Sequence, residues 1–139
     1  MTKSPNPEKF LPLKPHWFHV LLSLGDQERH GYGIMQEVLD RTACKVRLWP
    51  ATLYGTLKRL MESGLIEESG ELPAPELDDA RRRYYRLTHL GRRVLAAESK
   101  RLEDLVRMIQ ATDVYRAGRR LVRTAPVVRF SIHRGENHR

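Results

Sequence analysis

The sequence has little of what several common classes of protein require. Among its 139 residues there is one cysteine, Cys44, which excludes an intramolecular disulfide framework and fits a reducing compartment. No apolar run approaches the length of a membrane span, about 20 residues, and residues 1–14 lack the apolar segment of a signal peptide. We therefore expect a soluble, cytoplasmic protein with no membrane partner.

Residue patterns typical of enzymes and metal proteins are also lacking. The glycines on either side of Tyr32 follow no predicted strand and precede no lysine at P-loop spacing, so they indicate a tight helix start. His16 and His19 share a helix face, but no acid or cysteine nearby completes a metal site. A lone thiol such as Cys44 most often fills a small space in a core. With no recognisable pairing of nucleophile and base, we predict no enzymatic activity, no metal and no cofactor.

Positive charge, by contrast, is present in excess. The chain has 25 lysines and arginines against 17 acidic residues, a net charge of +8, and a pI near 10.1, which favours a polyanionic partner. From Asp113 onward seven arginines stand against two acidic residues, a net +5, so residues 1–112 hold the remaining +3. Glycines and a proline interrupt residues 113–139, and we expect a basic, disordered tail there.

The chain is organised around a predicted helix at residues 50–64. Pro50 suits the first helical turn, where its missing N–H would have no partner, and Gly64 suits the position just past the last turn. Between them, apolar residues recur at steps of three and four and so form one stripe of a helix: Leu53, Leu57, Leu60 and Met61.

The opposite face of this helix has the composition of a DNA-reading surface. Small residues occupy its N-terminal half and cations follow one turn later, which suits a helix that enters the major groove and reaches phosphates. Taken alone, an amphipathic helix with an ordinary solvated face is the commoner explanation. The predicted DNA-binding residues on this face are Ala51, Thr52, Gly55, Lys58 and Arg59, with Tyr54 at its edge.

The preceding residues predict the rest of a helix-turn-helix. After an irregular arm at residues 1–14, residues 15–24 form a helix that is apolar nearly all round, which indicates burial on several sides. A short amphipathic helix follows and ends near Thr42, and residues 45–48 alternate weakly, as a short strand would. Together with the helix at residues 50–64, these elements predict a helix-turn-helix.

Residues 65–88 predict a wing. Residues 65–69 and 82–87 are strand-like, and residues 70–81 are rich in proline, glycine and acids, as a hairpin loop is. The loop is acidic, so we do not expect its tip to enter a minor groove. Four cations near the second strand are predicted to meet the DNA backbone, although a solvated charged face is an equal alternative: Arg81, Arg82, Arg83 and Arg86.

The last predicted helix, residues 89–111, carries an apolar stripe that a finished winged helix leaves uncovered. The first helix of a second subunit is the natural partner, which predicts a two-fold homodimer. The predicted dimerisation residues are Trp17, Leu21, Leu95, Leu102, Leu105 and Ile109.

These elements give one fold class: mainly α with a small β-hairpin. The domains are an arm at residues 1–14, a winged helix-turn-helix at residues 15–88, a dimerisation helix at residues 89–112 and the tail. In such a dimer two reading helices would dock about 34 Å apart, so the partner is a double-stranded operator with an inverted repeat.

Several linked motifs resemble the PadR family of bacterial transcriptional regulators. The resemblance implies a winged-helix dimer that represses promoters and is released by a small-molecule effector or another signal. It also implies DNA reading by the helix positions from Thr52 to Arg59 and the strand positions from Arg83 to Arg86. The motifs are His30-Gly31-Tyr32-Gly33-Ile34, Ala51-Thr52-Leu53-Tyr54, Leu57-Lys58-Arg59-Leu60, Glu62-Ser63-Gly64-Leu65-Ile66, Tyr84-Tyr85-Arg86-Leu87-Thr88, and Gly91.

Two other functions stay open on the residues alone. The first is a basic RNA- or ribosome-associated protein, supported by the arginine-rich tail but without an RNP-like motif around the tyrosines. The second is a winged helix that serves only as a protein-interaction module. That alternative predicts that Lys58 and Arg59 pair with acidic residues instead of lying open.

Overall fold

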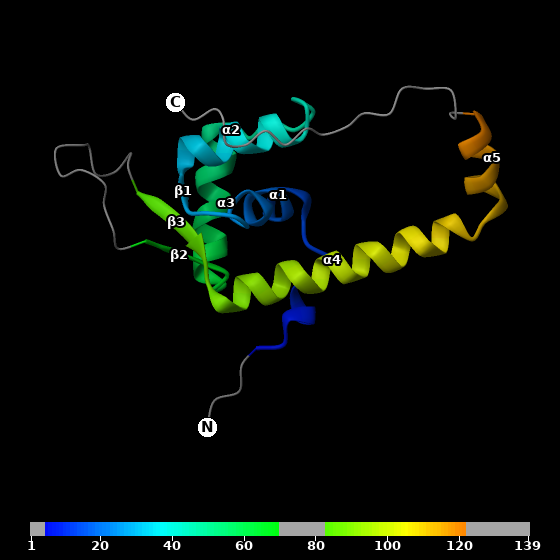
Figure 1. Cartoon of the computed structure of the whole chain (residues 1–139). Helices are drawn as coiled ribbons and strands as arrows, with labels where there is room; N and C mark the ends of the chain where they lie inside the picture. Colours follow the sequence, from blue (N-terminus) through cyan, green and yellow to red (C-terminus); the bar gives the residue numbers. More distant parts are fainter. Residues whose placement is uncertain (1–4, 70–82, 122–139) are drawn as a thin grey trace. The chain divides into compact units, whose positions relative to one another are not determined.

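The structure is a computed structural model of the chain, and it describes residues 5–69 and 83–121. The chain divides after Ser99 into two compact units. The elements confirm the predicted fold class, mainly α with a small sheet in a winged helix-turn-helix. In chain order (Figure 1) they are η1 (Pro7–Phe10), α1 (Pro15–Ser23), β1 (Arg29–His30), α2 (Gly31–Arg41), α3 (Pro50–Glu62), β2 (Ile66–Glu68), β3 (Tyr84–Leu87), α4 (His89–Gln110) and α5 (Asp113–Leu121).

The sheet has three short antiparallel strands, where we predicted two. Strand β3 lies in the middle and pairs with β2 on one side and with β1 on the other, with Tyr85 opposite Arg29. Because β1 has only two residues, it carries no alternating pattern that sequence analysis can detect. The strand predicted at residues 45–48 is wrong. That segment is irregular and is held by Leu48, which is buried in the core.

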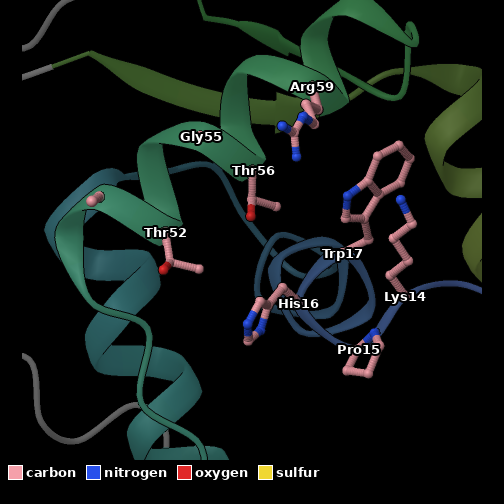
Figure 2. Close-up of a pocket in the computed structure, with 9 residues that line it drawn as sticks. Lys14, Pro15, His16, Trp17, Thr52, Gly55, Thr56 and Arg59 are labelled. Atoms are coloured by element: carbon pink, nitrogen blue, oxygen red, sulfur yellow. The ribbon is translucent and has the colours of Figure 1, made fainter.

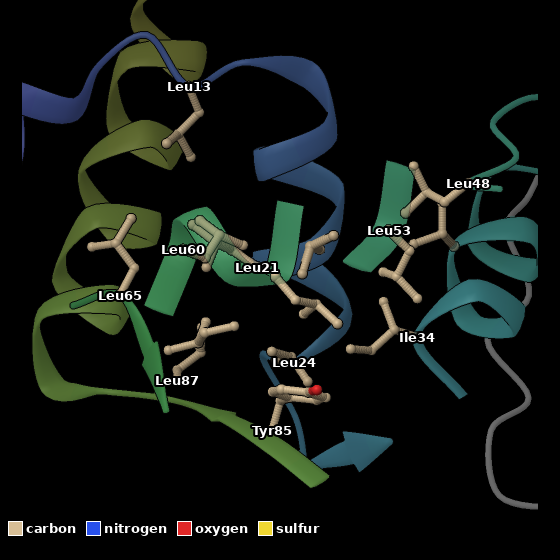
Figure 3. Close-up of a cluster of buried hydrophobic side chains, with 14 of the residues drawn as sticks. Leu13, Leu21, Leu24, Ile34, Leu48, Leu53, Leu60, Leu65, Tyr85 and Leu87 are labelled. Atoms are coloured by element: carbon tan, nitrogen blue, oxygen red, sulfur yellow. The ribbon is translucent and has the colours of Figure 1, made fainter. Parts of the chain in front are cut away.

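The core of the first unit lies where α1, α2 and α3 pack together above the sheet (Figure 3). The predicted leucine stripe of α3 supplies its centre, since all three of its leucines are buried. Tyr85 and Leu87 of β3 complete the core from the sheet side. The buried hydrophobic residues of the three helices are Val20, Leu21, Ile34, Val38, Leu53, Leu57 and Leu60.

The end of α3 confirms the predicted glycine stop. Gly64 has a φ of +79°, which a residue without a Cβ adopts at little cost. The amide of Leu65 donates to the carbonyl of Leu60 and that of Gly64 donates to Met61, which is the Schellman arrangement. The hydroxyl of Thr88 donates to the Gly64 carbonyl at 2.6 Å. This end therefore fixes where the chain turns into β2.

Thr88 also begins α4, as predicted. Its hydroxyl oxygen accepts a hydrogen bond from the amide of Gly91 at 3.0 Å, the usual geometry of an N-cap. The helix then runs to Gln110, within one residue of the predicted end. None of the described helices is long and apolar enough to cross a membrane.

The N-terminal arm is more ordered than predicted. Residues Pro7–Phe10 form a short 3-10 helix, η1, and Leu13 packs into the core. The amide of Leu13 donates to a carboxylate oxygen of Glu98, a buried residue of α4, at 3.4 Å. The arm therefore covers the hydrophobic core of its own chain.

The start of the tail differs from the prediction as well. Residues Asp113–Leu121 form the helix α5, not a disordered segment. The hydroxyl of Thr112 accepts from the amide of Tyr115, and the carboxylate of Asp113 pairs with Arg116. A cap and an i,i+3 ion pair thus favour a helix that Gly118 weakens by about 1 kcal/mol. Residues 122–139 of the predicted tail lie outside the described residues.

Candidate nucleic-acid interface

Helix α3 presents the predicted reading face to solvent. All six residues of that face are exposed: Ala51, Thr52, Tyr54, Gly55, Lys58 and Arg59. A Cβ placed on Gly55 would meet no other atom within 4 Å, so this position is open as well as small. The leucines behind the face are fully buried, which fixes the rotation of the helix about its axis. The exposed face of α3 therefore has small residues in its N-terminal half and two cations one turn later.

Tyr54 is only partly available, with 45% of its surface exposed. Its ring and hydroxyl lie against Gly31 at the start of α2, where any added Cβ would collide with them. His30 caps the same helix, because its Nδ1 accepts a hydrogen bond from the amide of Gly33 at 3.1 Å. Gly31 thus allows the close packing of α2 against α3. This agrees with the predicted tight helix start.

The cations of α3 have no acidic partner in the part of the chain that the structure describes. Lys58 and Arg59 form no ion pair with any residue in the ranges 5–69 and 83–121. The protein-interaction alternative predicted such pairs, and the described part of the chain does not contain them. Two positive charges therefore remain available beside the small residues of the face.

The cations of the wing strand are paired instead. The guanidinium of Arg86 lies 2.9 Å from a carboxylate oxygen of Glu67, and that of Arg83 lies 3.2 Å from Glu68. The Arg86 pair joins β3 to β2, the Arg83 pair joins the residue before β3 to β2, and both pairs are exposed. The prediction that these arginines face phosphate did not anticipate their acidic partners. Arg81 and Arg82 lie outside the described residues.

A cleft borders the reading face, and sequence analysis missed it. Its volume is about 440 Å³, and Figure 2 shows it between the start of α1 and the side of α3. Thr56 points into it from α3 although only 7% of that residue is exposed. A threonine within the buried leucine stripe was the one sequence signal for this site. The lining residues are Lys14, Pro15, His16, Trp17, Ala51, Thr52, Gly55, Thr56 and Arg59.

Comparison with known proteins identifies the scaffold that carries this face. The profile described as the transcriptional regulator PadR-like family matches residues 20–97, more than half of the chain. A relative from Mycobacterium tuberculosis, the transcriptional regulator Rv3488, is 36% identical over 100 residues, which cover 72% of this chain and 87% of the relative. The chain belongs to the PadR-like family of transcriptional regulators. The resemblance seen in the sequence motifs is therefore confirmed, and the protein is a DNA-binding transcriptional regulator.

Solved structures agree with the fold of this PadR-like regulator. A PadR family transcription regulator from Clostridium difficile superposes with a TM-score of 0.58 at 22% identity, over 70% of this chain and 96% of that one. PadR of Bacillus subtilis, solved in complex with operator DNA, gives a TM-score of 0.53 at 22% identity, over 62% of this chain and 47% of that one. At this level of identity the likeness shows a common fold.

The predicted dimerisation residues of the regulator do not share one environment. The prediction for Leu21 is wrong, since its side chain is fully buried in the core of its own chain and leaves no surface for a partner. Leu95 and Trp17 are half-buried and pack against the same core. In the second unit Leu102 is half-buried, while Leu105 and Ile109 are 38% and 55% exposed. Of the six predicted dimerisation residues, only Leu105 and Ile109 are exposed.

The remaining reactive side chains form no site among the described residues. Within residues 5–69 and 83–121 no cluster of three histidines, cysteines or acids could hold a metal ion. Burial, followed by the nearby His16, lowers the pKa of His19. Cys44 is exposed, so its prediction as a core residue is wrong. With Ala43 it lies in the left-handed region of the backbone, at a turn that carries its side chain outward.

Proposed function

We propose that this PadR-like regulator is a cytoplasmic homodimeric repressor that reads an inverted-repeat operator with α3. The observation that carries the proposal is the open face of α3, with a small N-terminal half and the cations Lys58 and Arg59, which have no acidic partner among the described residues. An α-helix fits the major groove of B-DNA, and residues near its N-terminus commonly approach the bases. We infer that Thr52, Tyr54 and Gly55 lie nearest the bases, while the cations reach phosphates.

The proposed dimer interface is the exposed apolar stretch of α4. Its large apolar residues lie three and four positions apart, with the ion pairs of Asp104 with Lys100 and Arg107 beside them. Such a stripe on a soluble protein favours burial against a second helix. A two-fold pair would present two α3 faces to DNA about one helical turn apart. The apolar residues of the stretch are Leu102, Leu105, Val106, Met108 and Ile109.

The proposed release by a small molecule or another signal rests on the resemblance to the family. Such a signal would have to bind the DNA-free state more tightly than the DNA-bound state, since only differential affinity shifts an equilibrium. A screen for compounds that lower operator affinity tests this part separately. A regulator whose operator binding no compound changes would still be a repressor under another control.

The direct test is selection of bound duplexes from a random library, with a structured RNA pool as competitor. We expect enrichment of an inverted repeat with half-sites about one turn apart. Preferential retention of RNA, or duplexes with no shared sequence, would contradict the proposal. Because repression is part of the proposal, the selected operator placed in a reporter promoter should lower transcription when the regulator is present.

The dimer is tested by sedimentation at micromolar concentration. Leu105→Asp and Ile109→Asp should give monomers, because a carboxylate cannot be buried unpaired in an apolar interface at little cost. Val114→Asp is the matched control. Val114 is an exposed apolar residue of α5 outside the proposed stretch, and its variant should remain dimeric. A monomeric wild-type protein would contradict the proposed assembly.

A further inference from the structure

The cleft between α1 and α3 presents donors and cations and no carboxylate. Its lining residues include the cations Lys14 and Arg59, the imidazole side chain His16 and the hydroxyl side chains Thr52 and Thr56. None of its nine lining residues is acidic. Two permanent positive charges and two hydroxyls match the needs of an oxyanion. They are a poor match for a cation.

Thr56 gives the clearest sign that a ligand completes this cleft. The residue is 7% exposed, and its hydroxyl forms no hydrogen bond with any other described residue. Threonines in helices commonly bond back to the preceding turn, as Thr42 does to the carbonyl of Val38 at 2.7 Å. In Figure 2 the Thr56 hydroxyl points into the cleft, on the side that faces α1. The hydroxyl of this nearly buried residue thus opens into the cleft, where a ligand can donate to it or accept from it.

The first turn of α1 supplies further donors. Lys14 is the N-cap of this nine-residue helix, and no side chain caps its amides. The positive end of the helix dipole and its free N–H groups favour an anion there. The Lys14 ammonium lies 5.6 Å from the centre of the Trp17 ring, so a cation–π contact holds it at the edge of the cleft.

We propose that this cleft binds a phosphate group of the DNA backbone beside the groove that α3 enters. The inference rests on the proposed function, because the cleft shares Thr52, Gly55 and Arg59 with the reading face. A free phosphorylated compound offers the same chemistry, but the shared face favours DNA as the source. The volume exceeds that of one phosphate group and leaves room for an attached sugar against Trp17. Lys14 and Thr56 would then fix how deeply α3 inserts.

The test measures affinity for a duplex selected from the random library, at several salt concentrations. Lys14→Gln should lower the affinity for selected and random duplexes alike and reduce the salt slope by about 0.9. Thr56→Val keeps the shape and removes the hydroxyl, so it should weaken binding about five- to tenfold with the slope unchanged. Lys9→Gln is the charge-matched control, since Lys9 is exposed and does not line the cleft.

A second measurement locates the phosphate. One phosphate of the duplex at a time is replaced by an uncharged methylphosphonate. One position in each half-site should weaken binding of the wild-type protein but should not weaken binding of Lys14→Gln any further. Thermal unfolding checks that both variants fold. If Thr56→Val does not fold, Lys14→Gln alone still tests the inference.

The outcomes separate this inference from the proposed function. If the wild-type protein selects no duplex, the proposed function fails. If it selects a duplex that Lys14→Gln and Thr56→Val bind as well as wild type does, only the phosphate cleft is overturned. A third outcome would show that the cleft binds phosphate that does not come from DNA. In that outcome, inorganic phosphate shifts the Thr56 and His16 amide resonances, but both variants retain full DNA affinity.

Discussion

The two basic regions of this regulator differ in what their cations contact. On α3, Lys58 and Arg59 have no acidic partner among the described residues. On the wing, Arg86 of β3 is paired with Glu67, and Arg83, the residue before β3, is paired with Glu68. Both regions appear equally basic when positive residues alone are counted. A paired cation must break its ion pair before it can bind phosphate. We therefore expect a paired cation to contribute less to DNA affinity than an unpaired one.

The pairing of the wing follows from strand register. In the antiparallel ladder Glu67 stands directly opposite Arg86, so their side chains share one face of the sheet. An exposed ion pair of this kind is worth about 0–1 kcal/mol, so DNA can compete for the arginine at a modest cost. We therefore expect the wing to contribute to affinity, but less per arginine than α3 contributes per cation.

The largest expected effect follows a change at Gly55. Gly55→Leu should lower operator affinity at least about 100-fold, because a leucine on the open face would hold α3 away from several base contacts worth about 1–3 kcal/mol each. Stability should stay equal or rise by up to about 1 kcal/mol, since leucine favours helix more than glycine does. Binding titrations and thermal unfolding measure the two effects.

Gly118→Leu is the control for that variant. Gly118 is also a helical glycine with no neighbour within 4 Å of an added Cβ, but it lies in α5. Its replacement should change operator affinity little. Full operator affinity in a folded, dimeric Gly55→Leu protein would show that the α3 face does not enter the groove.

Local signals predicted the reading helix well. The signals that define α3 all lie within or next to its own segment: Pro50, Gly64 and the leucine stripe. The helix could therefore be located without knowledge of its contacts with other segments. The N-cap of α4 at Thr88 is local in the same sense. These features define where the face begins, where it ends and which way it points.

Long-range contacts account for most of what the sequence did not predict. Strand β1 pairs with residues more than fifty positions away, and the arm is held by Leu13 against Glu98. The partners of Arg83 and Arg86 depend on the register of β2 against β3. The cleft depends on bringing the start of α1 to the side of α3. The residue pattern of one segment does not reveal which distant segment it will contact.

The next effect in size concerns Lys58. Lys58→Ala should weaken binding to all duplexes about tenfold and lower the salt slope by about 0.9, because it removes one unpaired contact to phosphate. Lys100→Ala is its control, as that lysine pairs with Asp104 on α4. A slope unchanged from wild type would place Lys58 away from the backbone.

A smaller loss is expected on the wing. Arg86→Ala should weaken binding only about threefold. To contact phosphate, Arg86 must first break its ion pair with Glu67, which is worth up to about 1 kcal/mol, so the net contribution of that contact is small. Its salt slope should fall by less than that of Lys58→Ala when both are measured on the same duplex. An equal loss for the two variants would mean that the pair seen in the free protein does not restrain the arginine.

The smallest effect has the opposite sign. Glu67→Gln should tighten DNA binding about twofold, because Arg86 no longer has an acidic partner to leave when it contacts phosphate. Removing any acid from a DNA-binding protein also reduces repulsion, so Glu103→Gln, an exposed change on α4, serves as the charge-matched control. The gain specific to Glu67 should disappear when Arg86→Ala is added, since the released arginine is then absent. If Glu67→Gln binds no more tightly than Glu103→Gln, the ion pair is not what separates the wing from α3, and the distance of β3 from the DNA becomes the better explanation.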